Sequence, residues 1–121
     1  MNLRGEFERC WPWLAAAIEH GGGTHSKEDL WGIIGAGNAH LVPLAHGALV
    51  TTMQQYPTGL RDVHGWLAGG NLEEIVKAEP RVADYYKSQG CHRVTITGRD
   101  GWLRKMPGYK KTGVILVKDL R

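Results

Sequence analysis

Long apolar runs and cysteines are scarce in this sequence of 121 residues. It holds no run of about 18 apolar residues, the length that a membrane-spanning helix needs. The first residues, MNLRGE, lack the apolar core and the small-residue cleavage site of a signal peptide, so we expect a soluble cytoplasmic protein. We then expect the two cysteines, Cys10 and Cys91, to be reduced core thiols rather than a disulfide.

The length of the chain limits it to one domain. Domains commonly have about 100 to 150 residues, so we expect residues 1–121 to form a single domain, which excludes a two-domain enzyme. The hydrophobic fraction of 42% and the charged fraction of 22% are ordinary for a globular protein, and no repeat or low-complexity segment interrupts them.

Positive charge is concentrated in the last third of the chain. Residues 1–80 carry five Lys and Arg against nine Asp and Glu, whereas residues 81–121 carry ten Lys and Arg against three Asp. This asymmetry indicates an anionic partner for the last third. The alternative is that these side chains cover the solvated faces of a helix and a strand.

Three segments have helical periodicity. Apolar residues recur at intervals of three and four in 6–19, after Ser26, and in 72–89, which predicts a buried stripe on each helix. Ser26 is the expected N-cap of the second helix. We expect Pro12 to mark the first turn of the first helix or to kink it, and Pro80 to kink or break the third.

Strands are predicted on both sides of the third helix. We expect strands at 41–44, 48–54 and 60–67, joined by tight turns into an antiparallel meander. A further strand at 91–97, a short helix ending near Met106 and a last strand at 109–118 complete the chain. The predicted fold class is therefore α+β, in the order helix, helix, three strands, helix, strand, short helix, strand.

Several short motifs make this order more specific. Residues 88–96 read SQGCHRVTI, residues 98–104 read GRDGWLR, and residues 107–110 read PGYK. The motifs CWPW at 10–13 and KDL at 118–120 stand near the two ends. Together with the order of elements, these motifs resemble the GNAT superfamily of acyl-coenzyme A N-acyltransferases, and within it the small GNAT-like proteins encoded by bacteriophages. The resemblance covers nearly the whole chain.

The resemblance implies a site for acetyl-coenzyme A or another acyl-coenzyme A. In GNAT enzymes a central strand ends at a Gly-rich turn, and the next helix presents its free backbone N–H groups to the pyrophosphate. A gap beside this strand would admit the pantetheine arm, and a backbone N–H within 63–66 would polarise the acyl carbonyl. The implied cofactor-binding residues are Trp66, Leu67, Ala68, Gly69, Gly70, Asn71, Arg99 and Arg104.

Two features depart from the pattern of the enzymes. Only Gly69 and Gly70 remain of the Gly-rich turn, and Asn71 with Glu74 predicts a capping arrangement that satisfies N–H groups of the helix internally. Glu74 and its neighbour also add negative charge where a diphosphate would lie. Arg104 stands where many of these enzymes carry a tyrosine acid, and a guanidinium cannot serve as one at neutral pH.

Catalytic candidates lie on the third predicted strand. His64 and Asp62 occupy the region where GNAT enzymes often place a general base, and an imidazole of near-neutral pKa can deprotonate an amine. The alternative is that both are exposed residues of a half-buried strand. Tyr85, Tyr86 and Tyr109 could donate a proton or could pack in the core.

Histidines and basic residues suggest two other kinds of site. The six histidines show no His-x-x-x-His spacing and the cysteines no Cys-x-x-Cys motif, so we expect no metal. Basic and aromatic residues of the last third could bind phosphates and stack on bases, although nothing in the pattern reads base sequence. These residues are Arg93, Arg99, Arg104, Lys105, Lys110 and Lys111, with Trp102 and Tyr109.

Two functions remain open on this reasoning. The first is a divergent acyltransferase that acts on an amine of a host protein, a small molecule or a nucleic acid, with His64 or Asp62 as the base. The second is a non-catalytic GNAT-like virion component or host-takeover protein that binds an acidic protein, a nucleic acid or another anion through the basic last third. Both place the protein in the cytoplasm of an infected host, the second also in the virion, and neither involves a membrane.

Overall fold

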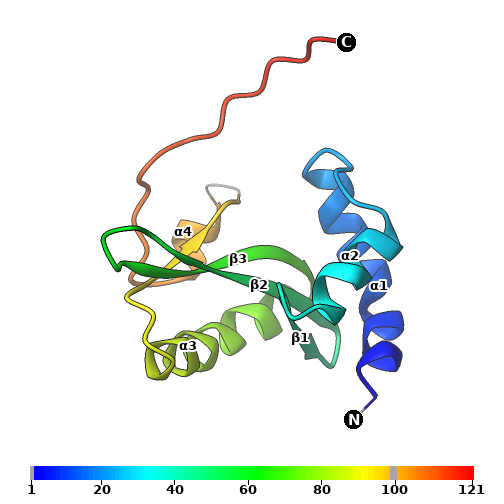
Figure 1. Ribbon diagram of the computed structural model, residues 1–121, viewed down its shortest axis with the longest axis horizontal. Coiled ribbons are helices and arrows are strands. Elements are labelled where there is room, and N and C mark those ends of the chain that lie inside the picture. The colour runs from blue at the N-terminus through cyan, green and yellow to red at the C-terminus, as the bar shows by residue number, and fades with distance from the viewer. Residues whose placement is uncertain (1, 99–100) are drawn as a thin grey trace.

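The computed structural model describes residues 2–98 and 101–121. The elements in chain order are α1 (Leu3–His20), α2 (Lys27–Gly35), β1 (His40–Leu44), β2 (Gly47–Gln55), β3 (Arg61–Gly70), α3 (Leu72–Ser88), β4 (Arg93–Ile96) and α4 (Gly101–Lys105). The strands form one mixed sheet in the order β1-β2-β3-β4, with β1 to β3 antiparallel and β4 parallel to β3 (Figure 1). The predicted α+β class and antiparallel meander are confirmed.

The first helix is longer than predicted and contains its proline. It begins at Leu3, where the side chain of Asn2 accepts a hydrogen bond from the Gly5 N–H, so Pro12 lies inside the helix and not in its first turn. Helix α2 begins as predicted, because Ser26 and Asp29 form a reciprocal capping box. Within 2–98 and 101–121, no helix combines the length and the hydropathy that crossing a membrane requires.

Two apolar clusters form the core, on opposite faces of the sheet. The larger cluster joins α1 and α2 to the sheet through Phe7, Leu14, Leu30 and Val50. The smaller one joins α3 to the sheet through Val63 and other residues. Figure 1 shows α1 and α2 on one side of the strands and α3 on the other. Cys10 and Cys91 are buried free thiols, as the sequence predicts.

An irregularity in β3 turns neighbouring residues to different faces. Thr51 pairs with Gly65, whereas the preceding Val50 pairs with Leu67, so Trp66 is an extra residue in β3. A β-bulge of this kind shifts the alternation of side chains by one residue. Leu67 therefore joins the larger cluster while Val63 joins the smaller one, although simple alternation predicts that they share a face.

Helix α3 follows β3 after a single residue. Gly69 and Gly70 pair with Ala48 and Gly47 of β2, so the turn that was expected at these glycines is instead the end of a strand. Asn71 then caps the helix. Pro80 does not divide α3, which runs without interruption from Leu72 to Ser88.

The strand predicted at 109–118 is absent. Residues 106–121 contain no helix or strand, and the chain from Lys110 to Arg121 is exposed throughout. Figure 1 shows this segment leaving the body of the molecule and running away from the sheet. Residues 109–118 have no adjacent strand among the described residues, and a strand is stable only when its backbone groups are paired.

Candidate functional site

Strands β3 and β4 part within the sheet. Their parallel register begins at Asp62 with Arg93 and ends at Gly65 with Ile96. Strand β3 then continues for five residues to Gly70, whereas β4 ends at Ile96. In the described part of the chain, these last five residues of β3 have no strand on the β4 side. Their backbone groups on that side are therefore available to a ligand.

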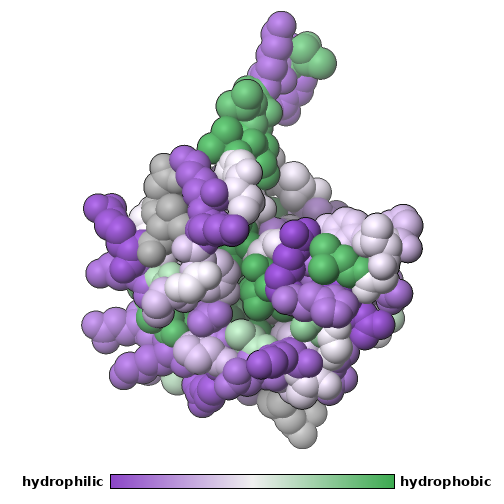
Figure 2. Space-filling model, turned by 90° about the vertical axis from the view of Figure 1, so that its left-hand side faces the viewer, coloured by the Kyte–Doolittle hydropathy of each residue, from purple (hydrophilic) through white to green (hydrophobic). Residues whose placement is uncertain are grey.

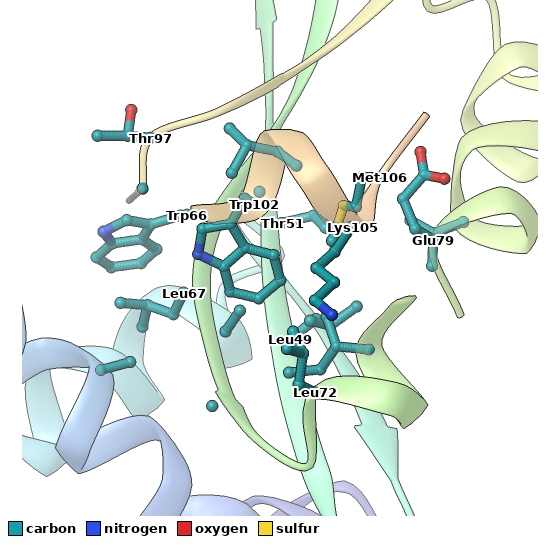
Figure 3. Close-up of a pocket in the computed structure, with 18 of the residues that line it drawn as sticks. Leu49, Thr51, Trp66, Leu67, Leu72, Glu79, Thr97, Trp102, Lys105 and Met106 are labelled. Carbon is teal, nitrogen blue, oxygen red and sulfur yellow. The ribbon is translucent and has the colours of Figure 1, made fainter. Parts of the chain in front are cut away.

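A cavity of about 840 Å³ opens where the two strands part (Figure 3). Its walls come from β3, β4, α3 and α4, with contributions from α1 and β2. The lining is mainly apolar and includes Leu49, Val63, Trp66 and Trp102. Apolar walls with a few convergent polar groups are typical of small-molecule sites.

The cavity collects most of the residues that the resemblance implicates in cofactor binding. Trp66, Leu67, Ala68, Gly69, Gly70 and Arg104 line it. Asn71 does not line the cavity, because its side chain caps α3. Arg99 lies outside the described residues.

Packing accounts for the two glycines at the end of β3. A Cβ on Gly69 would overlap the backbone of Trp13, and one on Gly70 would overlap His46 and Gly47. Gly70 also has a φ of 99°, a left-handed conformation that favours glycine. Close packing on α1 and on the turn between β1 and β2 therefore requires glycine at both positions, independently of any ligand.

Some of the backbone N–H groups at the N-terminus of α3 already have hydrogen-bond acceptors within the protein. Asn71 Oδ1 accepts a hydrogen bond from the Glu74 N–H at 3.0 Å, which confirms the predicted cap. The Glu74 carboxylate does not return to Asn71, because it accepts from the backbone N–H of His46 at 2.9 Å and contacts its Nδ1 at 2.8 Å. The His46 N–H holds the pKa of Glu74 below its usual value. Among the described residues, only the N–H groups of Leu72 and Glu73 stay unpaired at this end.

Two cations line the cavity and have no counter-ion among residues 2–98 and 101–121. Arg104 and Lys105 come from α4, and neither forms an ion pair or a side-chain hydrogen bond with any described residue. Figure 3 shows Lys105 reaching from α4 into the cavity, with its amine on the side of Leu72, where α3 begins. An ammonium and a helix N-terminus that face the same space both favour an anion.

Tyr109 and Glu79 form a polar pair in the same wall. The Tyr109 hydroxyl donates a hydrogen bond to Glu79 Oε1 at 2.8 Å. Burial and this carboxylate raise the pKa of Tyr109, so the phenol stays protonated at neutral pH. Of the tyrosines considered as proton donors, Tyr109 lines this cavity, whereas Tyr86 is buried against Thr51 and Tyr85 is exposed.

Glu79 is a cavity residue that the sequence reasoning missed. It lies in the 3,4 series Leu72, Ile75, Glu79, Val82 and Tyr86, so an acid occupies a core position of an otherwise apolar stripe. An acidic residue at a core position of an apolar stripe is a signal in the sequence that indicates a functional role for Glu79. Lys105 was recognised as basic, but no feature of the sequence places its amine in the cavity.

The two predicted bases, His64 and Asp62, lie on β3 beside the cavity and do not line it. Asp62 is 2% exposed and accepts a hydrogen bond from Arg93 Nε at 2.6 Å, which holds the pKa of its carboxyl below its usual value. His64 Nδ1 is 2.8 Å from Thr95 Oγ1 on β4. Burial lowers the pKa of His64, so its imidazole is neutral at neutral pH.

Two bacterial proteins of known structure share this architecture. Ribosomal-protein-alanine N-acetyltransferase of Brucella melitensis biovar Abortus matches with a TM-score of 0.61 and 12% identity, over 98% of this chain and 96% of that chain. A protein of Thermus thermophilus matches with a TM-score of 0.58 and 15% identity, over 95% and 93%. The fold is GNAT-like. No family model and no curated protein sequence matches the chain.

The lining of the cavity in this GNAT-like fold suits a coenzyme A thioester. Its apolar walls fit a pantetheine arm, and the positive charges of Arg104 and Lys105 fit phosphates. Gly65 leaves room beside the arm, because a Cβ there would only touch Ile96 at 3.6 Å. No three His, Cys, Asp or Glu side chains in 2–98 and 101–121 are grouped so as to hold a metal ion.

Proposed function

We propose that the protein is an acyl-coenzyme A-dependent N-acyltransferase that acts on an amine. The observation that carries this proposal is the divergence of β3 and β4 after Gly65 and Ile96, which opens a cavity lined by two cations that have no ion-pair partner in the described part of the chain. The acceptor would be an amine of a protein, a small molecule or a nucleic acid. The likeness to a solved N-acetyltransferase supports the fold, and the cavity supports the chemistry.

The cations of α4 would hold the phosphates of the cofactor in place of a Gly-rich turn. Arg104 and Lys105 are free to form charge-assisted hydrogen bonds, whereas Gly69 and Gly70 are committed to packing. When bound, acyl-coenzyme A supplies an activated acyl group as a thioester. Gly65 and the apolar walls would exclude water from its arm.

Backbone donors of β3 would polarise the acyl carbonyl. Residues 62–65 are paired with β4, so the first donors free on that side come from the bulge at Trp66 and from Leu67. Fixed N–H groups that face developing negative charge commonly contribute about 3 kcal/mol of transition-state stabilisation. These donors overlap the segment 63–66 that the resemblance implies only at Trp66, and they extend one residue beyond it.

Proton transfer would use groups on both sides of β3. His64 lies beside the cavity, so its neutral imidazole would accept the amine proton through a bridging water, since Nε2 has no partner among the described residues. Asp62 is less suited, because its carboxylate is engaged with Arg93. Tyr109, protonated and hydrogen-bonded to Glu79, can hold a proton at the opposite wall for the departing thiolate.

A thermal-shift titration tests this proposal. Acetyl-coenzyme A should raise the Tm saturably, and at about 100 times its Kd the gain is about 2.7 kcal/mol. Desulfo-coenzyme A and adenosine 3′,5′-bisphosphate, compared at low and moderate salt, separate binding of the whole cofactor from attraction of any polyanion. Gly65→Val should narrow the cavity where β3 and β4 part and reduce the shift, whereas Gly113→Val in the exposed tail should preserve it.

The same titration can overturn the proposal. No shift at millimolar acetyl-coenzyme A, or an equal salt-sensitive shift with every polyanion, would show that the cavity takes no acyl-coenzyme A. Transfer itself is then measured with labelled acetyl-coenzyme A and a panel of amines. His64→Gln should lower that rate while leaving the thermal shift intact.

A second candidate is a non-catalytic binding module. It is favoured by the loss of the Gly-rich turn, because Gly69 and Gly70 are closed by packing, and by the basic last third of the chain. In that case the protein would be a phage-type virion component or a host-takeover binder of an acidic protein or nucleic acid. It predicts recovery with purified phage particles, or capture of a polyanion that weakens steeply with salt.

A further inference from the structure

The chain ends in an apolar segment that the body of the molecule leaves uncovered. Val114 and Ile115 are 65% and 70% exposed, and Leu116 and Val117 are 88% and 87% exposed. Figure 2 shows this apolar block projecting from the surface. A folded monomer rarely exposes consecutive large apolar residues to this extent, so the segment requires a partner.

The composition of the segment is that of a β-strand. Residues 112–118 read TGVILVK, with three β-branched residues among the four of the apolar block and no proline. The exposed chain is extended and has no hydrogen-bonded neighbour among residues 2–98 and 101–121 that would make it a strand. It therefore lacks only a sheet edge to pair with.

One edge of the sheet is open to such a strand. Strand β4 is the last in the order, so its outer side has no strand among the described residues. Its four residues, Arg93–Ile96, match the length of the apolar block 114–117 and include no proline. The opposite edge, β1, contains Pro43, which has no N–H to donate and interrupts pairing.

We propose that residues 112–118 add as a strand to the outer edge of β4 in a second copy of the chain. The tail of the second copy pairs in the same way with β4 of the first, so that the two chains form a closed, symmetric dimer. The tail starts at Tyr109, which is tied to Glu79 on α3, and Figure 1 shows it running away from its own sheet. That direction favours the edge of another copy over its own.

The apolar surface of the exchanged tails approaches the size of a specific interface. Four apolar residues of each added strand, Val114 to Val117, are 65% to 88% exposed. Covering both sets removes on the order of 1,000 Å² from water before the receiving edges are counted, which approaches the ~1,200 to 2,000 Å² of specific interfaces. The added strand also supports β4, one wall of the cavity, from outside.

Sedimentation velocity over a range of concentrations, combined with hydrogen–deuterium exchange, tests this proposal on the full chain. We expect a dimer in which residues 93–96 and 114–117 gain protection together as the concentration rises. Leu116→Pro removes a backbone donor and an apolar contact from each tail and should raise the dissociation constant at least about tenfold. Lys110→Pro, before the apolar block, is the matched control and should leave it unchanged.

These variants lie in exposed chain, so a change in dimerisation is not a failure to fold. A monomer at every concentration would overturn the proposal. So would protection of 114–117 that does not depend on concentration, because the tail would then occupy its own β4 edge. A dimer that survives Leu116→Pro would place the interface elsewhere. None of these outcomes depends on whether acetyl-coenzyme A binds.

Discussion

Asp62 and Arg93 hold β3 and β4 together at the end opposite the cavity. They are register partners in the parallel ladder, and Arg93 Nε donates a hydrogen bond to Asp62 Oδ1 at 2.6 Å. The Asp62 side chain is 2% exposed and that of Arg93 is 54% exposed. The ion pair therefore closes one end of the two strands, and the cavity opens where their pairing stops at Gly65 and Ile96.

Removal of the Arg93 side chain should destabilise the fold. Arg93→Ala leaves the buried Asp62 carboxylate without its cation and with Tyr56 as its remaining side-chain partner, and the loss of a hydrogen bond to a charged group costs about 1.5 to 3 kcal/mol. Urea denaturation measures this loss. Arg81→Ala, on the exposed side of α3, should change the unfolding free energy by less than about 0.5 kcal/mol. Equal small effects of the two substitutions would contradict the role given to Arg93.

The same pair predicts a dependence of stability on acid. The pKa of Asp62 is lower in the folded protein, so its contribution is complete above the unfolded pKa of about 3.9 and is lost as the pH falls toward the folded value. The stability difference between the wild type and Asp62→Asn should therefore shrink below about pH 4. Unfolding free energies from pH 2.5 to 7 check this. Asp84→Asn, on exposed α3, serves as the control.

Three glycine substitutions separate backbone conformation from close packing. Gly22→Ala meets only an unfavourable φ of 104° with open space around it, and should cost about 1 kcal/mol. The added methyl group of Gly69→Ala would overlap the backbone of Trp13 only. Gly70→Ala would suffer both the unfavourable φ and the overlap with neighbouring backbone. Overpacking adds about 1 to 3 kcal/mol, so the loss of Tm should be largest for Gly70→Ala. A Gly70→Ala variant as stable as Gly22→Ala would refute the packing account.

Lys105 and Arg104 should govern the binding of phosphates. Each charge-assisted hydrogen bond contributes about 1.5 to 3 kcal/mol, so Lys105→Ala or Arg104→Ala should weaken acetyl-coenzyme A binding by at least about tenfold. Isothermal titration calorimetry measures the change in Kd. Lys77→Ala, an exposed residue of α3 outside the cavity, should leave Kd unchanged. Equal losses in all three variants would indicate a general effect of charge.

His64 should remain neutral to a lower pH than an ordinary histidine. Its imidazole is partly buried, which lowers its pKa from the usual value of about 6.5. Its NMR titration should have its midpoint below that value, and His64→Gln assigns the signal. If His64 is the base, the acid limb of the rate profile should follow the same midpoint. A midpoint at or above 6.5 would contradict this environment.

Local patterns in the sequence determined the helices, most of the strands and the caps at Ser26 and Asn71. The apolar stripe with Phe7 and Leu14 and the cap at Ser26 depend only on nearby residues, so they were readable before any packing was known. The expected GNAT-like order of elements depends on the same local signals. The motifs around β4 made that order specific, and the fold agrees with it up to α4 but lacks the last strand.

Tertiary structure decided what depends on neighbours distant in sequence. The bulge at Trp66 arises from the register between β2 and β3, and it turns Leu67 away from the face that alternation predicts. The cavity exists because β4 is shorter than β3, and Lys105 enters it only through the placement of α4. The segment 109–118 has a strand sequence and yet forms no strand. A strand forms only when its backbone groups pair with the edge of a sheet. Whether such an edge is available depends on the assembled sheet and not on the local sequence of the strand.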